Sequence, residues 1–129
     1  MTLKEPHLIL ACDDNHDILE LLQMVLEGEG YRIRTVSTGR EVVERIRKER
    51  VDLLLLDLRM PELDGFEVLE RLKGMGIPAP PVVILSAKGL DEDREAAFRA
   101  GAREFLTKPF HVDGLLEAVR RILSANGQD

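Results

Sequence analysis

Short apolar runs alternate along the chain with longer segments whose apolar residues recur every three or four positions. Three runs are almost wholly apolar and end at, or directly before, an acidic or hydroxyl side chain: residues 7–12, 52–57 and 82–86. Runs of this length that are apolar on both faces are typical of strands buried inside a parallel sheet. Two weaker runs cover residues 31–36 and 103–107. Because polar residues alternate with apolar ones in 31–36, we expect that strand to lie nearer an edge.

Five further segments are predicted as helices. Four of them have apolar residues at the three- and four-residue spacing of an amphipathic helix, and the fourth in chain order is predicted to run from Asp91 through Ala96-Ala97-Phe98 to Gly101. Their apolar positions are, in chain order, Ile18, Leu21, Leu22 and Val25; Val42, Val43 and Ile46; Phe66, Leu69 and Leu72; Ala96, Ala97 and Phe98; and Leu115, Leu116, Val119, Ile122 and Leu123. We expect Thr38, Asp91 and Asp113 to cap the second, fourth and fifth helices at their N-termini. Glycines near Gly28 and Gly74 would end the first and third helices.

The order of the elements, a strand followed by a helix five times, predicts the fold class. It indicates an α/β fold with a doubly wound, five-stranded parallel sheet and helices on both faces. Right-handed crossovers leave few topologies, and the flavodoxin-like strand order 2-1-3-4-5 is the natural one for five strands. We expect one domain over residues 1–124 and a short flexible tail over 125–129.

Composition narrows the class of protein without defining its function. The 129 residues include 18 Lys and Arg against 24 Asp and Glu, which gives a net charge of −6. This acidic balance argues against direct nucleic-acid binding, for which a basic patch is expected. No apolar stretch is long enough to span a membrane. Cys12 is the single cysteine, so no disulfide can form within the chain, and we expect a cytoplasmic location.

Five polar side chains fall at the ends of the predicted strands. Asp13 and Asp14 follow the first strand, and Asp57, Ser86 and Lys108 end or follow the third, fourth and fifth. In an open parallel sheet, ligands bind outside the carboxyl ends of the strands, at the switch point in strand order. We therefore expect these side chains to converge on one edge of the sheet.

The three carboxylates predict a divalent-cation site. Like charges packed together repel unless a cation or proton intervenes, and oxygen ligands on an open cluster suit Mg²⁺ (or Mn²⁺). The alternative for Asp13 and Asp14 is simple helix capping. Asp57 could be a turn residue, or a nucleophile that forms an acyl phosphate. Lys108 and Ser86 could be ordinary surface and strand-end residues, or could bind phosphoryl oxygens.

Taken together, these residues resemble the receiver domain of two-component response regulators. The most specific stretch is residues 57–67, DLRMPELDGFE, which matches the run D-x-x-M-P-x-x-D-G-x-E of that family. The acidic pair Asp13-Asp14, the hydroxyl position Ser86, and the turn Lys108-Pro109-Phe110 match in the same order. The resemblance extends from His7 to about Leu123.

The resemblance implies a phosphorylatable signalling domain. Asp57 would be the phosphoacceptor, and a histidine kinase or histidine phosphotransfer protein would be the donor. Asp14, Asp57 and the backbone carbonyl of Arg59 would ligate Mg²⁺, with Asp13 acting mainly through water. Lys108 would contact the phosphoryl group, and the Lys108-Pro109 peptide bond would be cis. The protein would then be no enzyme beyond its own phosphorylation and slow dephosphorylation.

The resemblance also implies a switch and an output. Ser86 would move toward the phosphoryl group and Phe105, the aromatic switch position, would turn inward; ordinary packing of Phe105 is the alternative. The readout face would comprise the fourth helix, fifth strand and fifth helix, here residues 91–123. It would contact a downstream protein target or effector domain, or a second copy in a dimer linked to phosphorylation.

Two cations near the site depart from the commonest pattern. Arg59 and Lys88 lie two residues beyond Asp57 and Ser86. We hypothesise that both project over the mouth of the site and alter the access of the hydrolytic water; solvated surface charge is the alternative.

Three other functions remain open at this point. A phosphatase of the haloacid-dehalogenase class also has a nucleophilic Asp after an apolar strand, but the acid/base it needs two residues on is here Arg59. A flavin-binding electron carrier of the same fold would need a phosphate loop where this chain has Asp13 and Asp14. A non-phosphorylated interaction module is disfavoured because all five site residues are present.

Overall fold

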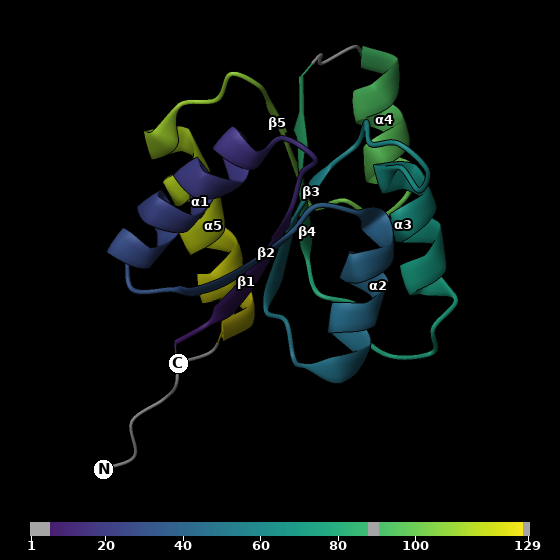
Figure 1. Cartoon of the computed structure of the whole chain (residues 1–129), viewed down its shortest axis with the longest axis horizontal. Coiled ribbons are helices and arrows are strands. Elements are labelled where there is room, and N and C mark those ends of the chain that lie inside the picture. Colours follow the sequence, from purple (N-terminus) through teal and green to yellow (C-terminus); the bar gives the residue numbers. More distant parts are fainter. Residues whose placement is uncertain (1–5, 88–90, 128–129) are drawn as a thin grey trace.

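The computed structural model describes residues 6–87 and 91–127 and forms the predicted α/β fold (Figure 1). Its elements are, in order, β1 (Leu8–Cys12), α1 (His16–Gly28), β2 (Arg32–Val36), α2 (Gly39–Lys48), β3 (Leu53–Asp57), α3 (Gly65–Lys73), β4 (Val82–Ser86), α4 (Asp91–Arg99), β5 (Glu104–Thr107) and α5 (Val112–Gly127). All four strand pairings are parallel. The strand order is β2-β1-β3-β4-β5, as predicted.

The sheet separates two apolar layers because successive strand residues point to opposite faces. On one face, Leu10, Leu54 and Ile84 pack against α2, α3 and α4. On the other face, Ile9 and Leu55 alternate with them and pack against α1 and α5. Figure 1 shows the same division, with α1 and α5 on one side of the sheet. The wholly apolar runs are therefore the inner strands β1, β3 and β4, whose residues are buried throughout.

The helix termini follow the expected chemistry in part. The Thr38 side chain caps α2 by accepting from the Glu41 amide, and Gly74 ends α3. The prediction that Asp113 caps α5 is wrong: the helix begins at Val112, which places Asp113 in its first turn. A negative charge remains favourable there because it faces the positive end of the helix dipole. The Asp91 side chain, expected to cap α4, lies outside the described part of the chain.

Two further details differ from the periodicity argument. The buried residues of α1 are Leu19, Leu22 and Leu26. Two of the positions expected to be buried, Ile18 and Val25, are only half-buried, so the buried face of the helix is slightly rotated from the predicted one. At the other end of the chain, α5 continues to Gly127, into the segment predicted as a tail. Among the described residues, no helix is both long and apolar enough to cross a membrane.

Candidate functional site

The predicted site residues lie together at the carboxyl edge of the sheet. Asp57 and Ser86 are the last residues of β3 and β4, and Asp13 and Lys108 directly follow β1 and β5. The sheet pairing extends past the strands, because the Lys108 amide donates to the Ser86 carbonyl at 2.6 Å. The parallel register thus brings together residues separated by up to 95 positions in the chain.

Three carboxylates form a compact acidic cluster. One oxygen from each of Asp13, Asp14 and Asp57 lies within 4.8 Å of the other two. Asp13 and Asp57 are buried, at 1% and 4% exposed, whereas Asp14 is exposed. Three negative charges at this separation repel one another, and the repulsion is strongest for the two that are withdrawn from water. The all-oxygen donor set and one open side fit a hydrated Mg²⁺ ion.

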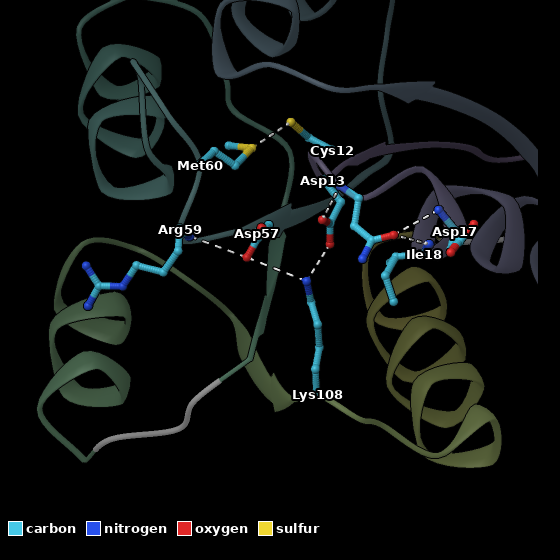
Figure 2. A network of polar contacts seen from close by, with 9 residues as sticks. Cys12, Asp13, Asp17, Ile18, Asp57, Arg59, Met60 and Lys108 are labelled. Carbon is cyan, nitrogen blue, oxygen red and sulfur yellow. Dashed lines mark hydrogen bonds and ion pairs between the residues drawn. The ribbon is translucent and has the colours of Figure 1, made fainter.

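Lys108 provides the positive charge nearest to this cluster among the described residues. Its Nζ lies 2.5 Å from Asp13 Oδ2 and 3.7 Å from Asp57 Oδ1. Figure 2 shows the lysine side chain extending from the end of β5 toward the gap between the two carboxylates. The ammonium is therefore bound to Asp13 while remaining within reach of a group attached to Asp57.

Two backbone amides complete the contacts of the buried carboxylates. The Asn15 amide donates to Asp13 Oδ1 at 3.0 Å, and the Arg59 amide donates to Asp57 Oδ1 at 3.3 Å. The Asn15 side chain caps α1 by accepting from the amides of Asp17 and Ile18. Capping is thus carried out by Asn15 and not by the acidic pair. The signal that could have identified it was Asn itself, a strongly preferred N-cap residue at the start of the helical pattern.

The environment of Asp57 raises its pKa from 3.8 to about 6. Burial is the largest cause, because it disfavours the charged carboxylate, and the negative charge of Asp13 acts in the same direction. Lys108 and the Arg59 amide oppose both effects and lower the pKa. A second cation at the cluster would favour the ionised carboxylate, which is the form that can act as a nucleophile.

The loop after β3 holds Asp57 close to the start of α3. Gly65 begins α3, and a Cβ on it would lie 2.7 Å from the Asp57 carbonyl oxygen and 2.8 Å from Leu58 Cα. Only glycine therefore fits at this approach without displacing backbone. The Asp64 and Glu67 side chains form a capping box that starts the helix at this point.

The two expected switch residues, Ser86 and Phe105, are both buried. Ser86 is 1% exposed, at the end of β4, and Phe105 is 4% exposed, in the neighbouring strand β5. The Phe105 ring packs in the same apolar layer as Ala97 of α4. The guanidinium of Arg94 lies over it, 5.6 Å from its centroid, a contact that sequence reasoning missed. Arginine on a solvated helix carries no local signal for such a cation–π contact.

The side chain of Arg59 does not project over the mouth of the site. Its Nη2 donates to Asp93 Oδ2 of α4 at 2.7 Å, and Figure 2 shows it directed away from Asp57. The prediction is therefore wrong for this residue, because its guanidinium pairs with a carboxylate of α4 that lies 34 residues away in the chain. Lys88, the other cation in that hypothesis, lies outside the described residues.

The site combines buried and exposed carboxylates, since Asp13 and Asp57 are buried and Asp14 is exposed. A cavity of about 1110 Å³ lies at the opposite, amino edge of the sheet, next to Val51, Pro81 and Arg103, and none of the predicted site residues lines it.

Comparisons with known proteins agree with this arrangement. A family model described as the response regulator receiver domain matches residues 9–120. The response regulator GtcR of Aneurinibacillus migulanus is 44% identical over 114 residues, which are 88% of this chain and 45% of that protein. A receiver domain protein from Methanospirillum hungatei superposes with a TM-score of 0.88 at 28% identity, over 95% of this chain and 98% of that one. A putative response regulator from Chloroflexus aurantiacus superposes with a TM-score of 0.85 at 34% identity, over 92% of this chain and 98% of that one.

The chain spans about half the length, or less, of the curated relatives it matches, between 26% and 52% of the first three. It aligns with almost the whole of the two solved structures. The match of the family model over most of the chain, together with the fold, identifies the family. The chain belongs to the receiver domains of two-component response regulators.

Proposed function

We propose that Asp57 accepts a phosphoryl group from a phosphohistidine on a histidine kinase or histidine phosphotransfer protein. The observation that carries the proposal is the position of the Asp57 carboxylate, 3.7 Å from Lys108 Nζ and in one acidic cluster with Asp13 and Asp14. A nucleophilic oxygen, a fixed cation and a divalent-cation site are the parts that phosphoryl transfer requires.

The transfer forms one bond and breaks one. A carboxylate oxygen of Asp57 attacks phosphorus as the P–N bond to the donor imidazole breaks, and the imidazole nitrogen keeps the electron pair and takes up a proton. Lys108 neutralises charge on the phosphoryl oxygens. The phosphorylated state ends by hydrolysis: a water oxygen attacks phosphorus as the bond between phosphorus and the Asp57 oxygen breaks, which releases inorganic phosphate and restores the carboxylate. The chain is then consumed and regenerated slowly, and does not turn over as an enzyme.

Mg²⁺ (or Mn²⁺) belongs to the same proposal. Asp14, Asp57 and the Arg59 backbone carbonyl would hold the ion, and Asp13 would contribute mainly through water. When bound, the ion supplies positive charge that offsets repulsion between the carboxylates and an incoming phosphoryl group. The fit rests on the three oxygen donors within 4.8 Å of one another.

The output is proposed to pass through Ser86 and Phe105. The Ser86 hydroxyl would bond the phosphoryl group, Phe105 would adjust behind it, and the face of α4, β5 and α5 would change its affinity for a protein target, an effector domain or a second copy. We place this event in the cytoplasm, in a single receiver domain that comprises residues 1–124 and the last turn of α5, to Gly127. The single buried cysteine is consistent with that compartment.

The phosphatase alternative has no support at the atomic level. The residue two positions after Asp57 is Arg59, and its guanidinium is paired with Asp93. A guanidinium remains protonated at any working pH and cannot serve as the general acid/base.

Intact-mass analysis tests the central step. The chain is incubated with Mg²⁺ and a small donor such as acetyl phosphate, and we expect an adduct of one phosphoryl group. Asp57→Asn should abolish the adduct, whereas Asp17→Asn, an exposed carboxylate in the first turn of α1, should leave it unchanged. An adduct that survives Asp57→Asn, or none with several donors, would refute the proposal.

A further inference from the structure

Arg59 donates hydrogen bonds to two separate parts of the structure, one from its backbone and one from its side chain. Its backbone amide donates to Asp57 Oδ1 at 3.3 Å, and its side chain donates to Asp93 Oδ2 at 2.7 Å. The proposed phosphoacceptor and the first turns of α4 are thus joined through one residue. In Figure 2 the Arg59 side chain leaves the β3 end and points toward α4.

The two partners of this ion pair differ in their exposure. The Arg59 side chain is 60% exposed, whereas the Asp93 side chain is only 16% exposed. If Arg59 leaves, Asp93 loses its partner while it remains mostly withdrawn from water. An unpaired carboxylate in such a place is unfavourable, so the first turns of α4 must adjust to expose it.

Phosphorylation of Asp57 would create a competitor for the same guanidinium. An acyl phosphate carries more negative charge than the carboxylate that it replaces, and its oxygens accept strong hydrogen bonds from arginine. Arg59 is anchored by its backbone beside Asp57, so its side chain can turn from Asp93 to the phosphoryl group without a movement of the main chain.

We propose that Arg59 exchanges Asp93 for the phosphoryl group on Asp57, and that this exchange releases α4. The inference rests on the proposed function of Asp57 and adds a second route by which α4 responds, separate from Ser86. The neighbour of Asp93, Arg94, lies over the rings of Phe98 and Phe105, at 5.4 and 5.6 Å from their centroids. A shift of the first turns of α4 would therefore move Arg94 relative to the ring of Phe105 in β5 and to the exposed Phe98.

The exchange predicts the effect of each variant on binding of a phosphoryl mimic. With beryllium fluoride and Mg²⁺ as the probe, Asp93→Asn should raise the affinity about twofold to fivefold, the range expected for one exposed ion pair. Arg59→Gln, which keeps the backbone, should lower the affinity. In the Arg59→Gln background, Asp93→Asn should have no further effect, because the ion pair between Arg59 and Asp93 is already absent.

The control is Glu95→Gln, which removes the same charge from the same helix. Among the described residues Glu95 forms an ion pair with Arg99 of α4, at 3.9 Å, and this variant should bind the probe like the unchanged chain. Nitrogen-15 NMR of the Arg59 side chain provides a second readout, since its Nε signal should move when the probe binds, and should already be moved in Asp93→Asn.

The outcomes separate this inference from the function on which it rests. Equal effects of Asp93→Asn in both backgrounds, an unchanged affinity in Asp93→Asn, or an Arg59 signal that does not respond would overturn the exchange alone. Failure of the unchanged chain to bind the probe would overturn both the exchange and the proposed function.

Discussion

Lys108 Nζ lies 2.5 Å from Asp13 Oδ2, although 95 residues separate the two in the chain. Both side chains are withdrawn from water, with 14% and 1% exposed. Asp13 therefore holds the lysine in place, and the ammonium is directed toward Asp57, 3.7 Å away. The pair positions a cation where a phosphoryl group on Asp57 would develop charge.

Replacing Lys108 should change the titration of Asp57. In metal-free protein, we expect Lys108→Met to raise the Asp57 pKa above its value of about 6, because Lys108 is a cause that lowers it. Carbon-13 NMR of the Asp57 carboxyl group measures the pKa. Lys48→Met, an exposed lysine at the end of α2, should leave it unchanged. A lower Asp57 pKa in Lys108→Met would contradict the assigned electrostatics.

The ionised Asp57 carboxylate should destabilise the folded state, so the chain should be less stable above the pH at which Asp57 ionises. Its pKa is about 6 in the folded chain against 3.8 as the ordinary value, so the folded state binds a proton more tightly. The free energy of unfolding then falls as pH rises from about 4 to 6, relative to a variant that cannot ionise. With Mg²⁺ chelated, Asp57→Asn should be more stable than the unchanged chain at pH 7–8, by on the order of 3 kcal/mol at most.

Urea unfolding at several pH values provides the measurement. The difference between Asp57→Asn and the unchanged chain should shrink below pH 6 and disappear near pH 4. A difference that stays constant across this pH range would show that ionisation of Asp57 does not destabilise the folded state.

Mg²⁺ binding should depend on the acidic cluster and on pH. We expect Asp14→Asn to weaken binding, whereas Asp17→Asn, exposed and three residues away, should not. Binding should also weaken below about pH 6, because protonation of Asp57 removes a charged ligand. Calorimetric titration with MgCl₂ measures both effects; equal affinity at pH 5 and pH 8 would argue against Asp57 as a ligand.

Two glycine substitutions should have opposite effects on stability. Gly65→Ala introduces a Cβ 2.7 Å from the Asp57 carbonyl oxygen, a contact with backbone that cannot yield cheaply. We expect a loss of about 1–3 kcal/mol, typical of overpacking. Gly114→Ala, in α5 with nothing near the added Cβ, should instead gain about 0.5–1 kcal/mol. The midpoints of urea unfolding of the two variants test both predictions. A Gly65→Ala variant that is more stable than the unchanged chain would contradict the close approach of Gly65 to the Asp57 carbonyl oxygen.

Local sequence patterns determined the architecture of this protein. The apolar runs at β1, β3 and β4 can be buried only in the middle of a sheet, and the alternating run at β2 could be predicted as an edge. Five strand–helix repeats and right-handed crossovers then leave few strand orders, of which the observed 2-1-3-4-5 is the natural one for five strands. Because parallel strands end at one edge, the meeting of Asp13, Asp57, Ser86 and Lys108 followed from their positions at strand ends. These are properties of backbone periodicity, which neighbouring residues in the chain establish.

Only the tertiary structure decided which side chains are paired. In the folded chain Lys108 pairs with Asp13, and Arg59 pairs with Asp93 of α4. The raised pKa of Asp57 likewise depends on burial by elements distant in sequence. The physical reason is competition between possible partners. Each charged group could pair with several others, and the pair that forms depends on distances and solvent exposure that exist only once the layers have packed.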